Sequence, residues 1–111
     1  MVRGVKVLDL NDFFYFVQVV DRGGFTAAGS TLRVPKSTLS YRIQQLEAQL
    51  EVRLLNRTSR RFRMTDAGEE FYRYAVSMLL NAEQAESAMR QRLVEPSGTV
   101  RFTSGVATAW V

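Results

Sequence analysis

The chain has 111 residues, of which 46% are hydrophobic, and a formal net charge of +4 at neutral pH. This length and composition suit one small folded domain with a hydrophobic core. Because the sequence contains no cysteine and no histidine, disulfides, zinc fingers and imidazole-based catalysis are excluded. We expect no metal and no cofactor, and since no paired carboxylates form a recognisable site, we expect no enzyme.

The charge is distributed unevenly along the chain. Residues 1–65 contain 11 basic and 5 acidic side chains, a balance of +6, whereas residues 66–111 contain 4 and 6, a balance of −2. A basic first half predicts binding to a polyanion. No apolar run approaches the ~20 residues that span a bilayer, and the N-terminus lacks the apolar stretch of a signal peptide, so we expect no membrane partner.

The first predicted helix covers residues 9–22, and its apolar residues recur at helical spacing. Asp9 is suited to cap its first turn, and Gly23 with Gly24 is suited to end it. We expect Thr26 to be the N-cap of a second, short helix. The predicted inward face of the first helix consists of Leu10, Phe13, Phe14, Val17 and Val20, widened by Phe16 and Val19.

The stretch from Pro35 to Leu50 is predicted to be the helix around which the chain is organised. Its inward stripe is formed by Leu39, Ile43, Leu46 and Leu50. The opposite face is polar and almost uncharged, with hydroxyl and amide groups that donate and accept hydrogen bonds as base edges do. Together with the preceding short helix and the turn at Pro35, it predicts a helix-turn-helix. The members of that outer face are Ser37, Tyr41, Gln44 and Ala48, flanked by Ser40 and Gln45.

Two short strands with an arginine-rich loop are predicted to follow the third helix. Residues 52–55 supply the first strand and residues 62–64 the second. A hairpin of this kind beside a helix-turn-helix is typical of a wing, since guanidinium groups suit phosphates and narrow minor grooves. Strand alternation would place Arg61 and Arg63 on one face, toward the nucleic acid or away from it. The four arginines are Arg57, Arg60, Arg61 and Arg63.

A long helix, capped by Thr65, is predicted over about residues 66–93. It carries an apolar seam whose members step by 4, 3, 4, 3 and 4 residues, a heptad pattern. Such a seam either packs within one chain or against a second copy, and its length favours a homodimer. The seam, and therefore the predicted dimer contact, consists of Phe71, Ala75, Met78, Ala82, Ala85 and Met89.

The sequence thus predicts three parts. Residues 1–65 form a DNA-binding head, residues 66–94 a linker and dimerisation helix, and residues 95–111 a hinge followed by the first strand of an absent domain.

These segments resemble the N-terminal DNA-binding region of LysR-type transcriptional regulators over about residues 8–102. The run Val34 to Thr38 is similar to that of CrgA-type regulators. The resemblance implies an all-α fold: a winged helix-turn-helix with a small two-stranded β-wing and a long C-terminal dimerisation helix. The residues that carry it are Ala27, Ala28, Leu32, Leu39, Ser40, Ile43, Leu46, Glu47, Leu50, Leu54, Arg57, Arg60, Thr65 and Gly68.

The resemblance also implies the function. We expect sequence-specific binding of double-stranded DNA by a cytoplasmic, nucleoid-associated bacterial transcriptional regulator, with the helix of residues 36–50 in the major groove. The expected partners are DNA and a second copy of the chain. Since the effector domain is expected to be absent, no small-molecule effector is expected either. The alternative is a dimeric helical interaction module whose basic surface binds anions without sequence preference.

The family's base-reading positions correspond to Lys36, Ser37, Ser40 and Tyr41, and its minor-groove arginine to Arg60. Arg42 lies near the edge of the apolar stripe, so it either contacts a phosphate or forms an ion pair within the chain, for which Glu47 is a candidate. The residues expected to contact DNA are Thr26, Lys36, Ser37, Thr38, Ser40, Tyr41, Arg42, Arg57, Arg60 and Arg61.

Three residues depart from the family pattern. Tyr41 stands where arginine is common, so a contact with a thymine methyl group or a phosphate replaces guanine readout. Glu51 stands where glycine is usual, which adds strain if the site is left-handed. Gly29 replaces an alanine and is expected to destabilise the second helix by up to ~1 kcal/mol.

Overall fold

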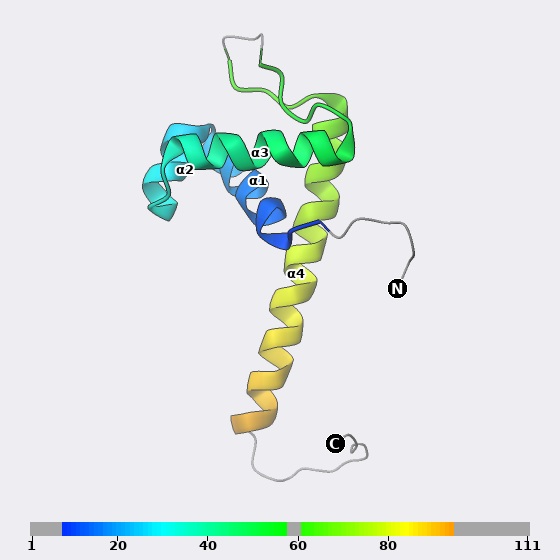
Figure 1. Cartoon of the computed structure of the whole chain (residues 1–111). Helices are drawn as coiled ribbons and strands as arrows, with labels where there is room; N and C mark the ends of the chain where they lie inside the picture. The colour runs from blue at the N-terminus through cyan, green and yellow to red at the C-terminus, as the bar shows by residue number, and fades with distance from the viewer. Residues whose placement is uncertain (1–7, 58–60, 95–111) are drawn as a thin grey trace. The chain divides into compact units, whose positions relative to one another are not determined.

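The computed structural model describes residues 8–57 and 61–94 (Figure 1). The four helices of this described part are α1 (Leu10–Arg22), α2 (Phe25–Leu32), α3 (Lys36–Leu50) and α4 (Asp66–Val94). Each lies where the sequence predicts a helix. Arg60 and residues 95–111, where the sequence predicts a minor-groove contact, a hinge and a strand, lie outside the described residues.

The turn between α1 and α2 is built by two glycines. The N–H groups of Gly23 and Gly24 donate to the carbonyls of Val20 and Val19, at 3.1 and 2.9 Å, which closes α1 as predicted. Gly24, and not Thr26, is then the N-cap of α2. The expectation for Thr26 was wrong because the Gly24 carbonyl already accepts the first helical bond of α2.

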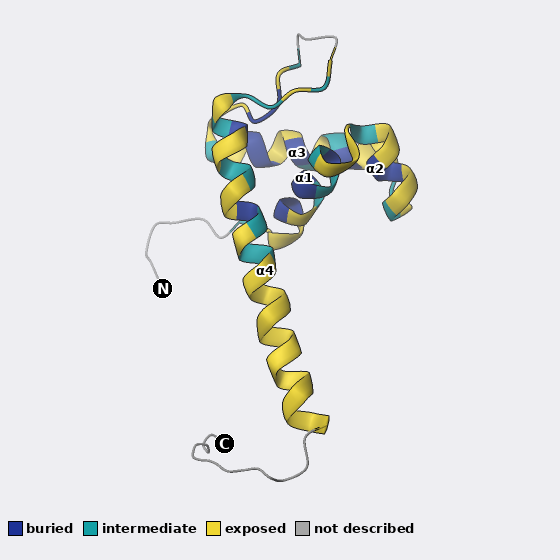
Figure 2. Cartoon of the chain, turned by 180° about the vertical axis from the view of Figure 1, so that it is seen from behind, coloured by how far each residue is buried: buried dark blue, intermediate teal, exposed yellow. Residues whose placement is uncertain are grey.

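α1, α2 and α3 pack against one another in pairs. The predicted stripe of α3 is confirmed: Leu39, Ile43 and Leu46 are fully buried, and Leu50 is half-buried. Figure 2 shows dark blue buried residues within both α1 and α3. The polar outer face of α3 is thereby directed away from the core.

The buried face of α1 differs from the predicted one. Leu10 and Phe14 are exposed, at 60% and 36%, whereas Phe16 and Val19 are fully buried. The reason is that α1 is covered from two sides. Phe16 clusters with α3 residues, and Phe13 clusters with α4 residues, so the buried face is centred between these two contacts.

The first turns of α4 belong to the same core as α1. The Phe71 ring lies 4.9 Å from that of Phe13 and 5.6 Å from that of Phe16, between centroids. Ala75 is fully buried in this cluster, and Met78 packs against it. For Phe71, Ala75 and Met78 the alternative of packing within one chain is therefore present, because α1 of the same chain packs against them, and their part in a dimer contact stays a prediction.

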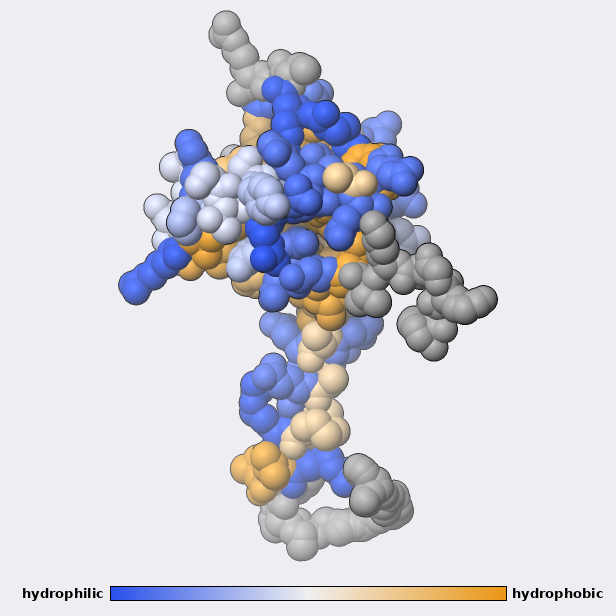
Figure 3. Space-filling view, viewed as in Figure 1, coloured by the Kyte–Doolittle hydropathy of each residue, from blue (hydrophilic) through white to orange (hydrophobic). Residues whose placement is uncertain are grey.

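The remainder of the predicted seam lies beyond the point where the chain divides into two compact units, between Leu79 and Leu80. Ala82, Ala85 and Met89 are all exposed, and a pale orange apolar strip runs along this part of α4 between blue polar side chains (Figure 3). The first unit covers Met1–Leu79, so the predicted boundary after residue 65 falls inside it. From here on, the head means this first unit.

A hairpin, described for residues 53–57 and 61–65, connects α3 to α4. A single antiparallel bridge joins Leu55 to Met64, and no strand is assigned in the described part of the chain. The Asn56 N–H donates to the Arg63 carbonyl at 2.9 Å, and the Thr65 N–H donates to the Leu54 carbonyl at 3.0 Å. The predicted two-stranded wing is not confirmed, because the two segments share so few backbone bonds.

The base of the hairpin is joined tightly to α4. The Thr65 hydroxyl oxygen accepts the Gly68 N–H at 2.9 Å and donates to the Arg53 carbonyl at 2.6 Å, which confirms Thr65 as the cap of α4. A Cβ atom on Gly68 would overlap the Leu54 carbonyl oxygen. Only glycine therefore allows this approach of the hairpin to the helix.

Candidate nucleic-acid interface

The outer face of α3 is the first part of the candidate interface. Ser37 and Tyr41 are exposed there and Ser40 is half-buried, and Lys36 and Thr38, beside this face in the first turn of α3, are exposed as well. Tyr41 exposes 59% of its surface, so its ring and hydroxyl are accessible to a partner. The exposure matches the prediction for these five residues, and their contact with DNA stays a prediction.

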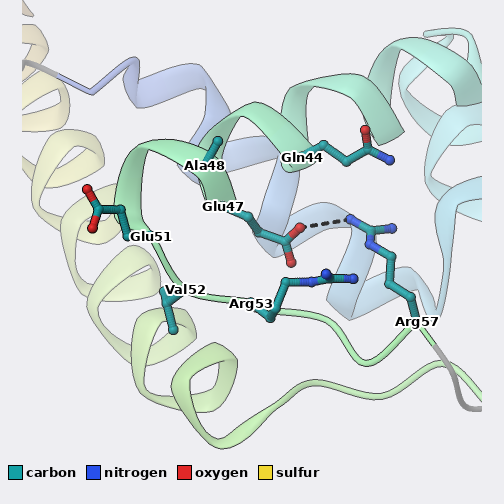
Figure 4. Close-up of a pocket in the computed structure, with 7 residues that line it drawn as sticks. All are labelled: Gln44, Glu47, Ala48, Glu51, Val52, Arg53 and Arg57. Atoms are coloured by element: carbon teal, nitrogen blue, oxygen red, sulfur yellow. Dashed lines mark hydrogen bonds and ion pairs between the residues drawn. The ribbon is translucent and has the colours of Figure 1, made fainter.

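The second part is the hairpin, which adjoins α3 along a shallow hollow of about 510 Å³ (Figure 4). Gln44 and Ala48 lie on the outer face of α3, and Arg53 and Arg57 lie on the hairpin. The structure thus brings the predicted outer face and two arginines to one surface. The residues lining the hollow are Gln44, Glu47, Ala48, Glu51, Val52, Arg53 and Arg57.

The start of α2 adjoins the other side of the hairpin. A hollow of about 400 Å³ lies between Phe25 and the hairpin arginines, and the Phe25 and Phe62 rings meet edge to face at 6.4 Å. Thr26, the predicted phosphate contact, is the next residue and is exposed. The hairpin residues lining this hollow are Leu55, Asn56, Arg57, Arg61, Phe62 and Arg63.

Arg42 is directed toward α1. Its Nε donates to Asp12 Oδ1 at 2.7 Å and its Nη2 to Asp9 Oδ2 at 2.9 Å, while the guanidinium lies 5.3 Å from the centre of the Tyr15 ring. The hydrogen bond to Asp12 raises the pKa of Arg42, against the opposing effect of burial. Of the two alternatives, the ion pair within the chain is present, and its partners are Asp9 and Asp12 instead of Glu47.

Glu47 is a buried acid whose carboxylate accepts hydrogen bonds from three donors. Its Oε2 accepts the N–H groups of Leu54 and Leu55 at 2.8 and 3.1 Å, and its Oε1 accepts Arg57 Nη2 at 3.1 Å. Arg57 is half-buried and also lies 5.8 Å from the centre of the Phe25 ring. Two of the predicted DNA-contacting arginines, Arg42 and Arg57, therefore neutralise buried acids of the chain.

The partners of these acids are not predicted from the sequence, which offers Glu47 only as a partner of Arg42, although a signal for their burial is present. Glu47 follows Ile43 by one helical turn and therefore lies beside the apolar stripe, and Asp12 precedes Phe16 by one turn. An acid at an inward position requires a cationic or hydrogen-bonding partner, because an unpaired buried charge is costly. The partner itself could not be found from spacing, since both arginines belong to other elements.

The head presents a mainly hydrophilic surface in the view of Figure 3. In residues 8–57 and 61–94, no group of acidic side chains could hold a metal ion. None of the helices described is long and apolar enough to cross a membrane.

This geometry is that of a helix-turn-helix head whose second helix presents a polar face beside a basic hairpin. The family described as "Bacterial regulatory helix-turn-helix protein, lysR family" matches residues 10–69. The chain belongs to this family of regulatory proteins, which is not a family of enzymes.

Individual relatives agree with this assignment. An HTH-type transcriptional regulator of Xanthomonas campestris pv. campestris is 44% identical over 86% of this chain and 28% of its own length. PtxR of Pseudomonas aeruginosa is 42% identical over 87% of this chain and 31% of its own. CrgA of Neisseria meningitidis is also a relative, at 36% identity over 82% of this chain and 30% of its own. The chain thus spans about three tenths of the length of these relatives.

A solved structure named as the BenM_DBD/catB site 1 DNA complex is similar to the chain. The TM-score is 0.77 at 34% identity, and the match covers 84% of this chain and 100% of the other. The likeness therefore extends over most of the chain.

Proposed function

We propose that this chain binds double-stranded DNA sequence-specifically, as the DNA-binding region of a bacterial transcriptional regulator. The observation that carries the proposal is the surface on which the exposed polar face of α3 adjoins the arginine hairpin. A polar, uncharged helix face suits base edges in the major groove, and guanidinium groups suit the phosphates beside it. The similarity to a domain solved with DNA supports the same function.

The parts of this surface have separate roles. Lys36, Ser37, Thr38, Ser40 and Tyr41 enter the major groove with the first turns of α3, as in other helix-turn-helix proteins. The hairpin acts as the wing, with Arg61 and Arg63 on the backbone side and Arg60 in the minor groove.

Thr26 binds a phosphate from the start of α2. Arg42 and Arg57 serve mainly to hold the head together, because carboxylates of the chain occupy their guanidinium groups.

The second part of α4 makes the homodimer. Ala82, Ala85 and Met89 are spaced as one apolar seam and are exposed in the single chain, so a second copy of the helix can cover them. Two heads held by this contact would read the two halves of an interrupted palindrome. Such a regulator acts on the bacterial nucleoid, in the cytoplasm.

Selection from a random duplex library at two salt concentrations, followed by sequencing, tests the function. Enrichment of an interrupted palindrome at both salt concentrations is the expected result. Equal retention of all sequences, with a steep loss at the higher salt, would mean phosphate binding alone. It would favour a basic interaction module over a sequence-reading regulator.

A further inference from the structure

Glu47 joins the two elements to which the proposed function assigns DNA contacts. Its side chain belongs to α3 and is 7% exposed. All three of its partners belong to the hairpin: the N–H groups of Leu54 and Leu55, and the guanidinium of Arg57. Figure 4 shows Glu47 lying between α3 and the hairpin, with Arg57 reaching it from the hairpin side.

The backbone of the hairpin needs these bonds. Within residues 53–57, the Leu54 carbonyl and the Asn56 N–H bond to residues 61–65, whereas the N–H groups of Leu54 and Leu55 bond to the Glu47 carboxylate. The backbone of residues 53–57 is therefore held both by residues 61–65 and by the carboxylate of Glu47. Besides the packing of Leu54 and Leu55 against Ile43 and Leu46, the bonds of Glu47 are polar contacts that fix the hairpin relative to α3.

Arg57 extends the same connection to α2. Its guanidinium bonds to Glu47 at 3.1 Å and lies 5.8 Å from the centre of the Phe25 ring, at the first residue of α2. The pair thus links the hairpin to both helices of the helix-turn-helix. A charge-assisted hydrogen bond has a well-defined geometry, which a loose charged loop would lack.

We infer that Glu47, through Arg57 and the two backbone amides, is a positioning residue that sets the register between the base-reading face of α3 and the arginine hairpin. This inference rests on the proposed function. According to this inference, Glu47 affects base preference at the positions that flank the half-site, where the hairpin meets the DNA. It does not affect base preference at the positions that α3 reads.

The test is the base-preference profile of the full chain carrying Glu47→Gln, obtained by selection from the random duplex library. Glutamine keeps one oxygen for the amides but presents an amide group to Arg57, so the charge pairing is lost. We expect enrichment at the flanking positions to fall about tenfold, the size of one lost base-pair preference, with the half-site profile retained. Glu70→Gln, an exposed acid on α4, removes the same charge and should leave the profile unchanged.

A second variant, Arg57→Met, keeps the bonds between Glu47 and the two amides. It should show the same selective loss at the flanks, and it decides the question if circular dichroism shows that Glu47→Gln is unfolded. An Arg57→Met profile that weakens evenly at all positions would mean a purely structural role and would overturn the inference. A lack of any base preference in the unchanged chain would overturn the proposed function itself, and the positioning role with it.

Discussion

Gly68 shows how one residue determines the junction between the hairpin and α4. We predict that Gly68→Ala lowers the free energy of unfolding by about 3 kcal/mol, because the new methyl group would overlap the Leu54 carbonyl. Gly29→Ala should cost less, since its Cβ would stand 2.9 Å from the Val34 carbonyl oxygen and alanine adds helix propensity. Urea denaturation of both variants measures the difference. Equal stability of Gly68→Ala and the unchanged chain would contradict this close approach of the two segments.

The structure also explains why Gly29 stands where the family pattern has alanine. The sequence predicts that glycine weakens α2, but the structure gives glycine a reason, because the turn to α3 passes directly over it. Propensity alone could not show this, since the contact is made by a residue five positions later.

Glu51 confirms the other predicted source of strain. It ends α3 in the left-handed region, at φ 59°, which disfavours a residue with a Cβ atom. Glu51→Gly should stabilise the head by about 0.5–1 kcal/mol, whereas Glu51→Ala keeps the Cβ atom and should give no such gain. The two variants are compared by thermal unfolding, and an equal gain from both would show that charge, and not backbone strain, is responsible.

The hydrogen bond of Tyr72 is expected to make the free energy of unfolding depend on pH in the alkaline range. Its hydroxyl donates to Asp21 Oδ1 at 2.5 Å, and this hydrogen bond, with burial and the nearby charge, raises the pKa of Tyr72 above its ordinary 10.0. The unfolded chain releases the proton at lower pH, so this contribution to stability is complete below about pH 10 and is lost as pH rises through the folded pKa.

Tyr72→Phe removes that contribution. We expect urea midpoints of the unchanged chain to fall more steeply between pH 9 and 11 (roughly spanning the ordinary tyrosine pKa) than those of the variant, with the exposed Tyr41→Phe as control. Parallel curves for the unchanged chain and Tyr72→Phe would rule out the bond to Asp21 as the source of the dependence.

At the scale of elements, the helices could be predicted because periodicity and caps are local. Of the predicted stripe of α3, three leucine and isoleucine residues are fully buried and Leu50 is half-buried, since a helix packed on one side buries one stripe. For α1, coverage by two neighbours agrees with its widened apolar face, but Leu10 and Phe14, predicted to face inward, are exposed. The wing could not be judged from strand propensity, because the two described segments form a single bridge and the N–H groups of Leu54 and Leu55 bond to a side chain of α3, Glu47.

Ser40 tests the role of α3 as the base-reading element. We predict that Ser40→Ala weakens binding to the selected site by about 1–3 kcal/mol and relaxes preference at one base pair. Arg63→Ala, on the hairpin, should weaken binding to all sequences evenly. It should also lower the slope of log binding constant against log salt concentration by about 1 in magnitude. Fluorescence anisotropy titrations with the selected duplex and single-base variants separate the two patterns. An even loss for Ser40→Ala would exclude base reading by this residue.

At the scale of the whole molecule, the heptad pattern predicted one continuous seam, whereas the structure buries its first part and leaves its second part exposed. Phe71 and Ala75 contact α1, whereas Ala85 and Met89 are exposed. Spacing could not divide the seam, because a residue covered by its own chain and one covered by a second copy have the same periodicity. Only the three-dimensional position of α1 distinguishes them.

The exposed part of the seam predicts the oligomeric state. Met89→Glu should weaken self-association at least about tenfold, since it places like charges opposite each other in an apolar contact. Gln84→Glu adds the same charge on the opposite side of the helix and serves as the control. Sedimentation velocity over a concentration series checks both, and an unchanged dimer in Met89→Glu would exclude this seam as the contact.

The central claim is that the outer face of α3 and the hairpin form one DNA-reading surface. Amide chemical-shift mapping of the chain with the selected duplex tests it most directly. We predict that the largest changes fall on residues 36–48 and on the described hairpin residues, 53–57 and 61–65. Changes confined to α4, with α3 unaffected, would contradict it.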